Sequence, residues 1–159
     1  MERGRLPRVR GGDRRPGAGR RGALALSRLC LDTSAYSQLK RGDAAVAQLI
    51  DEAGWIGIPT VVVGELLVGF FGGGRARENE AELAAFLGSP VVHELFVDRE
   101  TARIYAEIWT AASEARTPLP TTDVWIAACA AQAGASLLTF DAHFAAIGRI
   151  GTILLGARE

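Results

Sequence analysis

Four carboxylate side chains stand at the ends or in the middle of apolar segments, where charged residues are scarce. They belong to Asp32, Glu65, Asp123 and Asp141. A carboxylate in apolar surroundings loses its hydration, which costs free energy unless a cation or hydrogen-bond donors replace the water. No Lys or Arg occurs at residues 42–74 or 117–148, so partners of opposite charge are few along the sequence. One divalent cation shared by the four carboxylates would compensate them all.

The ligand types favour Mg²⁺ or Mn²⁺ over zinc, because carboxylate and water oxygens suit these cations. Two cysteines, Cys30 and Cys129, lie in apolar segments and are expected to be buried, and no Cys/His spacing fits a zinc motif. We expect His93 within a strand. We leave His143 outside the ligand set, although it can reach the edge of the site. Carboxylate-bound Mg²⁺ typically activates water and holds a phosphate, which indicates phosphodiester chemistry.

Each acid taken alone also has a structural explanation. Asp123 and Asp141 begin predicted helices and could be helix caps, and Asp32 follows a predicted buried strand. Glu65 is harder to explain this way, because apolar residues surround it on nearly every side of its predicted helix. We therefore expect Glu65 to be buried and to face a compensating group. Four separate structural roles remain the alternative to one shared cation.

Short apolar segments alternate with helical patterns, which is typical of an α/β fold with a parallel sheet. Strands are predicted at residues 28–32, 55–58, 91–96, 136–139 and 152–155. Helices are predicted at residues 43–53, 60–71, 78–87 and 123–133, and a short one begins at residue 141. A long helix is expected to be capped by Asp98, a structural role, and to turn Ala102, Tyr105, Ala106 and Trp109 inward.

This topology predicts where the acids meet. Ligands of open α/β sheets bind beyond the carboxyl ends of the strands. Asp32 ends the first strand, Asp141 follows the strand at 136–139, and Asp123 begins a helix that faces the same edge. The sequence therefore predicts three acids on one sheet edge, whereas Glu65 must be brought there by the middle of a helix.

Charge divides the chain into two unlike parts. Residues 1–28 hold nine arginines against Glu2 and Asp13, a net charge of +7, whereas residues 29–159 carry −7. We predict a disordered Arg/Gly-rich arm over residues 1–27, either a passive tail or sequence translated upstream of the natural start, and one folded domain over 28–159. A basic arm could also contact nucleic acid through phosphates. We expect no membrane span, no secretory signal and a cytoplasmic location.

Four segments of the chain resemble the PIN-domain ribonucleases, especially the VapC-type toxins of toxin–antitoxin pairs. They are LCLDTS at residues 29–34, PTVVVGELLVG at 59–69, TDVWIAA at 122–128 and LLTFDAHF at 137–144. Each segment alone is weak support, but the four in this order and at these separations are specific. The resemblance runs from about residue 28 to 155. It implies a PIN-like three-layer α/β/α fold with a central parallel sheet of about four to five strands.

The resemblance also implies a function. The four acids would bind Mg²⁺ or Mn²⁺, and metal-activated water would cleave single-stranded or looped RNA. Ser34 and Thr139 match small hydroxyl positions beside the acids and would support them or contact phosphate. The family implies a homodimer and a cognate antitoxin that inserts a segment into the acidic groove. The arm at residues 1–27 has no counterpart in the compact family pattern.

Three other classes can be weighed against this function. An aspartyl phosphatase usually carries a second acid two residues after the first, where this chain has Ser34, and needs a downstream lysine, which is missing after Lys40. An adhesion-type metal site would need serine where the chain has Tyr36. A non-catalytic PIN-like module that binds RNA or protein is the more serious alternative. Degenerate modules typically lose acids, and this chain keeps all four.

Overall fold

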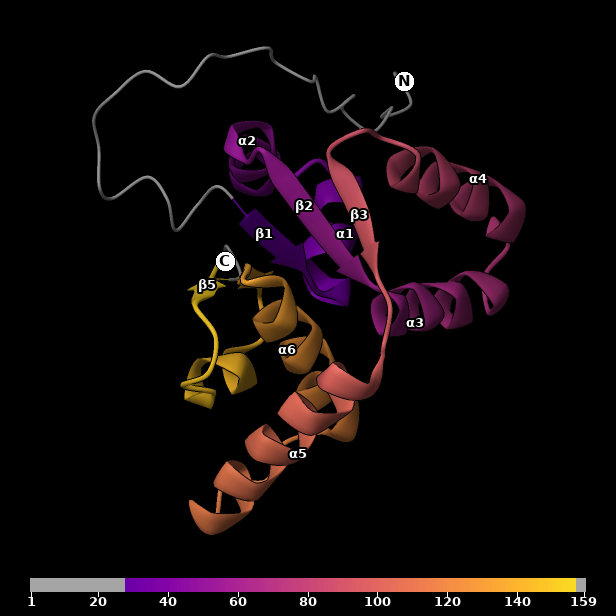
Figure 1. Ribbon diagram of the computed structural model, residues 1–159. Coiled ribbons are helices and arrows are strands. Elements are labelled where there is room, and N and C mark those ends of the chain that lie inside the picture. Colours follow the sequence, from indigo (N-terminus) through magenta and orange to yellow (C-terminus); the bar gives the residue numbers. More distant parts are fainter. Residues whose placement is uncertain (1–27, 157–159) are drawn as a thin grey trace, which may run out of the picture.

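Five parallel strands form the central sheet of the structure, a computed structural model that describes residues 28–156 (Figure 1). The strands are β1 (Arg28–Leu31), β2 (Trp55–Pro59), β3 (Val92–Leu95), β4 (Ser136–Thr139) and β5 (Thr152–Leu154). Their order in the sheet is β3-β2-β1-β4-β5, and every neighbouring pair is parallel. The predicted α/β class and strand number are confirmed. The predicted arm at residues 1–27 lies outside the described residues.

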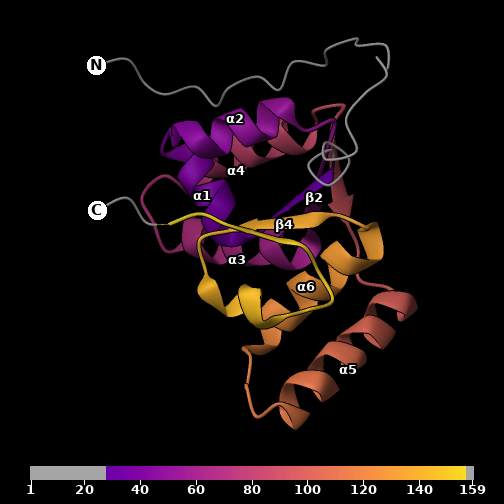
Figure 2. The same cartoon turned by 90° about the vertical axis from the view of Figure 1, so that its left-hand side faces the viewer.

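Helices cover both faces of the sheet, so the inner residues of its central strands are apolar. Figure 2 shows α1 (Thr33–Lys40) and α2 (Ala44–Glu52) on one side and α6 (Thr121–Ala133) and α5 (Arg99–Glu114) on the other. Leu29, Cys30 and Leu31 of β1 are all fully buried, as expected for a parallel strand covered on both faces. Among residues 28–156, no helix is both long and apolar enough to cross a bilayer.

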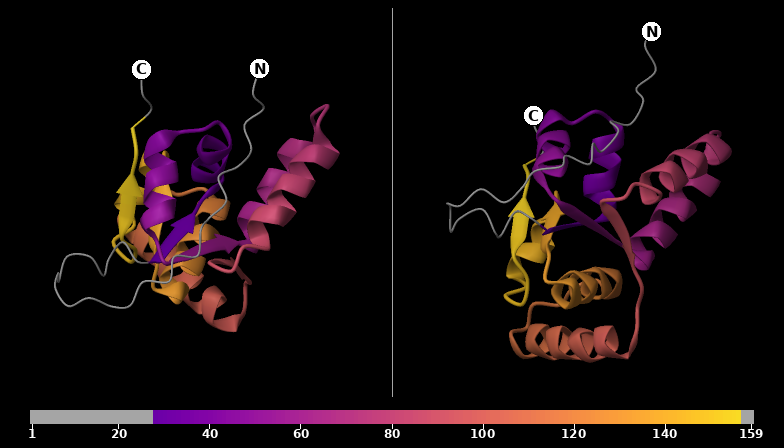
Figure 3. Two further views of the ribbon diagram at one scale, coloured as in Figure 1. Left: turned by 90° about the horizontal axis from the view of Figure 1, so that it is seen from above. Right: turned by 45° about the horizontal axis from the view of Figure 1, so that its top comes forward.

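Helices α3 (Thr60–Phe71) and α4 (Ala76–Leu87) form a hairpin that projects from one end of the sheet (Figure 3). Only Val62, Leu66 and Phe70 of α3 are buried, whereas Val68 is 74% and Phe71 66% exposed. The expectation that this helix is buried on all sides is therefore wrong. The apolar composition of α3 gives no sign that only one side of the helix is covered in the projecting hairpin.

Helix α1 was not predicted, although it carries an important part of the site. It buries Ala35, Tyr36 and Leu39 beneath a polar outer face. Its eight residues are too few to display a clear helical period, and its mean hydropathy is low. The helix is nevertheless well defined, because Asp32 caps its first turn.

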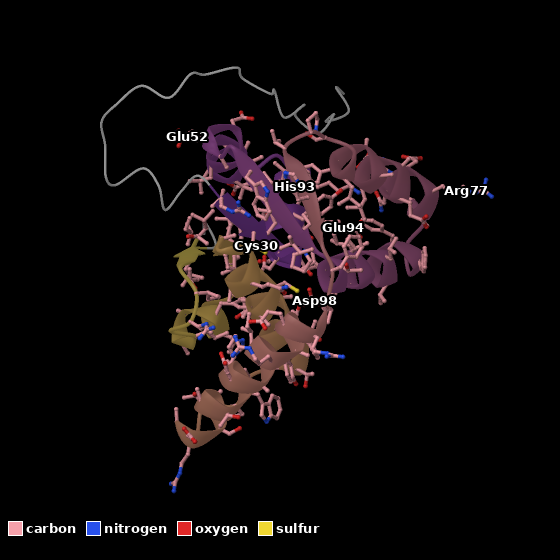
Figure 4. The ribbon with its side chains drawn as sticks, viewed as in Figure 1. Cys30, Glu52, Arg77, His93, Glu94 and Asp98 are labelled. Atoms are coloured by element: carbon pink, nitrogen blue, oxygen red, sulfur yellow. The ribbon has the colours of Figure 1, made fainter. Side chains whose placement is uncertain are left out.

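Helix α5 packs through a different face from the predicted one. Thr101, Ile104 and Ile108 are buried, whereas the predicted Trp109 is 44% exposed. Asp98 begins the helix as predicted (Figure 4) and forms a capping box with Thr101. Thr101 also donates a hydrogen bond to Gln132 of α6, so this cap sets the rotation of α5 against α6. Of the predicted inward positions, Ala102, Ala106 and Trp109 are exposed, and Tyr105 is half-buried.

Candidate metal centre

The acids lie beyond β1 and β4, where the strand order reverses. The chain adds β2 and β3 on one side of β1 and then β4 and β5 on the other. In open parallel sheets this reversal leaves a crevice at the carboxyl ends of the strands, and ligands bind there. Asp32 follows β1 directly, and Asp141 caps the 3-10 helix η2 (Ala142–Ala146), which begins just after β4. These two predicted positions share one sheet edge.

Asp32 is the most firmly held acid of the site and is only 4% exposed. Its Oδ1 accepts hydrogen bonds from the Ala35 backbone N–H at 2.8 Å and the Ser34 hydroxyl at 2.7 Å. Its Oδ2 accepts one from the Thr139 hydroxyl. Asp32 is thus a helix cap as well as a candidate ligand, and its oxygens retain lone pairs, because a carboxylate can accept about four hydrogen bonds.

Two hydroxyls connect this carboxylate to the end of β4. Ser34 Oγ accepts a hydrogen bond from the Phe140 backbone N–H at 3.0 Å. Thr139 Oγ1 accepts one from the Asp141 N–H at 2.9 Å. Each hydroxyl therefore donates to Asp32 and accepts from the strand end that leads to Asp141. The structure places both predicted hydroxyl residues against the acids, where they fix the separation of the two loops.

Asp123 has no comparable set of donors. Pro120 occupies the N-cap position of α6, so Asp123 lies in the first turn and does not cap the helix. Its Oδ2 is buried without a hydrogen-bond partner among residues 28–156. Burial, followed by the charge of Asp141 and with smaller contributions from Glu65 and Asp32, raises the pKa of Asp123 to about 6. The charges of the three other predicted acids all act on Asp123, so the four carboxylates lie in one neighbourhood.

Asp141 contacts a histidine that the sequence analysis left outside the ligand set. Its Oδ1 accepts a hydrogen bond from the backbone N–H of His143 at 2.9 Å and lies 2.9 Å from His143 Nδ1. Potential ligand atoms of Asp123, Asp141 and His143 all lie within 4.8 Å of one another. The sequence signal for His143 was its position two residues after an acid at the start of a short helix.

Glu65 differs from its prediction, because it is exposed and not buried. Its Oε1 accepts a hydrogen bond from the Thr33 hydroxyl at 3.2 Å, which links α3 to the first turn of α1. Thr33 was not predicted, although its position directly after Asp32 could have indicated it. Glu65 therefore borders the acids from the open side of the site.

The charge and ligand types of these residues are suited to binding a divalent cation. A buried carboxylate oxygen without a donor, Oδ2 of Asp123, is costly unless a charged partner compensates it. Burial, and after it the charge of Asp141, already favours protonation of this group, and a bound cation would offset both effects. Asp32, Asp123 and Asp141 supply only carboxylate oxygens as ligand atoms, the type that Mg²⁺ and Mn²⁺ accept. Such a centre can activate water and hold a phosphate.

Comparison with known proteins gives one family and a set of related folds. The PIN domain family model matches residues 29–150. No curated protein sequence matches the chain.

Several solved structures share the fold. VapBC2 of Rickettsia felis, bound to promoter DNA, has a TM-score of 0.71 at 19% identity, covering 80% of this chain and 98% of that one. VapBC-5 of Mycobacterium tuberculosis has a TM-score of 0.61 at 25% identity, with coverages of 81% and 99%. VapC20 of Mycobacterium tuberculosis, described as a sarcin–ricin loop cleaving toxin, has a TM-score of 0.55 at 22% identity, with coverages of 82% and 99%.

Proposed function

This chain belongs to the PIN domain family, and from that premise we propose that it is a metal-dependent endoribonuclease that acts as a growth-inhibiting toxin. The observation that carries the proposal is the buried, unpartnered Oδ2 of Asp123 among three further carboxylates. A purely structural acid at this position would be expected to find a donor, as Asp98 does in its capping box. An acid that holds a cation has a reason to keep that oxygen free of protein donors.

The residues would divide the work as follows. Asp32, Asp123 and Asp141 would hold Mg²⁺ or Mn²⁺, with Glu65 bordering the open side of the site. The bound cation would supply a polarised water for attack on the phosphodiester and neutralise charge on the phosphate. Ser34 and Thr139 would keep the two loops, and hence the carboxylates, at a fixed separation. Preorganised ligands of this kind need no rearrangement during the reaction.

The proposed toxin role is supported by the names of the solved structures that share the fold. Their names describe VapBC complexes and one toxin that cleaves the sarcin–ricin loop, so we propose RNA as the substrate and a cognate antitoxin as the partner. The family resemblance adds a homodimer in the cytoplasm. Residues 29–159 carry a net charge of −7, which would attract a basic antitoxin segment and repel RNA in general. RNA binding would therefore depend on a local groove or on a second subunit.

Substitution of Asp123 by Asn tests the enzyme claim. Purified Asp123→Asn should lose RNA cleavage by at least about a hundredfold in the presence of Mg²⁺ or Mn²⁺, because the amide withdraws one anionic ligand and the charge that it contributes. Asp51→Asn, an exposed aspartate of α2, is the matched control and should retain full activity. Circular dichroism should be unchanged in both variants. Full activity of Asp123→Asn would refute the metal-site assignment.

The alternative, a non-catalytic PIN-like module that binds RNA or protein, makes a different prediction in cells. A toxin should arrest growth when expressed alone, and co-expression of its antitoxin should relieve the arrest. Expression of the Asp123→Asn variant should be harmless. If abundant soluble wild-type protein leaves growth and cellular RNA unchanged, the binding module is favoured.

A further inference from the structure

His143 is placed to interact directly with whatever the acids bind. It lies in η2, with its Nδ1 2.9 Å from Asp141 Oδ1 and its side chain 63% exposed. The backbone N–H of His143 donates a hydrogen bond to Asp141, which holds the His143 backbone beside that carboxylate. The ring therefore stands beside one proposed ligand and within reach of a second, Asp123.

The separation of the imidazole nitrogen and the carboxylate oxygen is compatible with two arrangements. It suits a hydrogen bond, in which Nδ1–H donates to Asp141. It also suits two neighbouring ligands of one octahedral ion, which lie about 3.0 Å apart when each bond is about 2.1 Å long. A change from the hydrogen bond to the metal-ligand arrangement requires only that the ring proton move from Nδ1 to Nε2. Because the imidazole is exposed, the Nε2–H can then donate a hydrogen bond to water. No rearrangement of the backbone is needed.

A nitrogen donor changes which cation the site prefers. Mg²⁺ is bound almost entirely through oxygen, whereas first-row transition-metal ions also accept imidazole nitrogen. The distances assemble one nitrogen and two carboxylates within 4.8 Å of one another. Such a mixed set binds Mn²⁺ more strongly than an all-oxygen site of the same charge.

Building on the proposed function, we propose that His143 is a nitrogen ligand of the acidic cation site and gives that site a preference for Mn²⁺ over Mg²⁺. Nothing in the family resemblance assigns a role to this position. His143 thereby extends the oxygen ligand set with a residue that selects among cations.

The chain offers a matched control, because His93 is its only other histidine. Figure 4 shows His93 on β3, at the other end of the sheet order from β4. Its ring stacks on Trp55 at the start of β2, with 5.0 Å between ring centroids. The amino ends of the strands, where this stack lies, are opposite the edge that carries the acids. Any nitrogen signal from the bound cation can therefore be assigned by comparing two substitutions.

The experiment is electron spin-echo envelope modulation of the full-length protein loaded with Mn²⁺. Wild type and His93→Gln should show a ¹⁴N coupling of the size found for directly bound imidazole, and His143→Gln should lack it. Calorimetric titration should show Mn²⁺ binding to His143→Gln weakened by about tenfold or more. Mg²⁺ binding to the same variant should change much less.

The outcomes separate this proposal from the one on which it rests. If Mn²⁺ binds to wild type without a direct ¹⁴N coupling, or if His143→Gln weakens Mn²⁺ and Mg²⁺ equally, His143 only orients Asp141 and the proposal is overturned. If neither cation binds to wild type, the metal-site assignment itself fails. A ¹⁴N coupling that is lost only in His143→Gln establishes the ligand whether or not RNA is cleaved.

Discussion

The two aspartates at the start of α1 and α6 show how differently the same residue type can be held. Asp32 accepts hydrogen bonds from a backbone N–H and two hydroxyls, whereas Asp123 has a buried oxygen without a partner. Burial and neighbouring acids raise the pKa of Asp123 to about 6. The first aspartate stabilises the fold, whereas the second is maintained at a cost that the charge of His143 opposes.

This cost can be measured as a dependence of stability on pH. Since the native state binds the Asp123 proton more tightly than the unfolded chain, stability falls as pH rises from 3.8 to about 6 and this contribution is constant above that range. In the metal-free protein, Asp123→Asn should therefore raise the free energy of unfolding at pH 8 by about 1 kcal/mol after allowance for solvent screening, or about 3 °C in Tm.

The gain should shrink as the pH falls and should be lost near pH 4, where the wild-type carboxyl is already neutral. Thermal melts of both proteins after dialysis against EDTA measure it. A variant that is less stable than wild type at pH 8, or a gain that does not change with pH, would contradict the account of Asp123.

At this scale the sequence predicted the convergence of Asp32, Asp123 and Asp141, because parallel strands place their carboxyl ends at one edge. It did not predict how each acid is held. The exposure of Glu65 depends on how the α3–α4 hairpin projects, and the contact of His143 with Asp141 depends on the turn of η2. Both follow from tertiary arrangement, which the spacing of residues does not determine.

At the scale of the elements, helix α5 illustrates the limit of apolar patterning. The predicted inner positions Tyr105 and Trp109 are large and apolar, but the buried stripe is Thr101, Ile104 and Ile108. Tyr105 instead stacks at the margin on Trp125 of α6, with 4.0 Å between centroids. The rotation of α5 is set by its cap and by the hydrogen bond from Thr101 to Gln132. Both are polar contacts, which the spacing of apolar residues in the sequence does not reveal.

The corrected face of α5 predicts a difference between two alanine substitutions. Ile104→Ala removes a side chain that is 4% exposed and should lower the free energy of unfolding by about 3 kcal/mol. Val68→Ala on α3, at a position that is 74% exposed, should change it by less than about 0.5 kcal/mol. Urea denaturation compares the two. A small loss for Ile104→Ala would restore the originally predicted face.

At the scale of the whole molecule, the described domain contains every proposed ligand. The acids and His143 come from the residue that follows β1, from α3 and α6, and from the segment after β4, all within residues 28–156. None of the nine arginines of residues 1–28 is a member of this proposed ligand set. The fold class and sheet were predictable because short apolar segments alternate with helical patterns along the chain, whereas α1 and the placement of the α3–α4 hairpin were not.

Deletion of residues 1–27 should accordingly leave RNA cleavage within about twofold of the full-length value at physiological salt, since the proposed ligands are retained. The measurement compares initial rates for the two proteins at several salt concentrations. A large loss of RNA affinity that diminishes at high salt would instead assign the basic segment to phosphate binding.

The account rests most on the claim that cation-activated water, held at the acidic site, cleaves RNA. Cleavage of an RNA oligonucleotide in ¹⁸O-labelled water, followed by mass spectrometry of the first products, tests this claim most directly. We predict that cleavage requires Mg²⁺ or Mn²⁺ and stops in EDTA, and that each new terminal phosphate carries one ¹⁸O atom. A 2′,3′-cyclic phosphate without the label, or cleavage that continues in EDTA, would contradict the account.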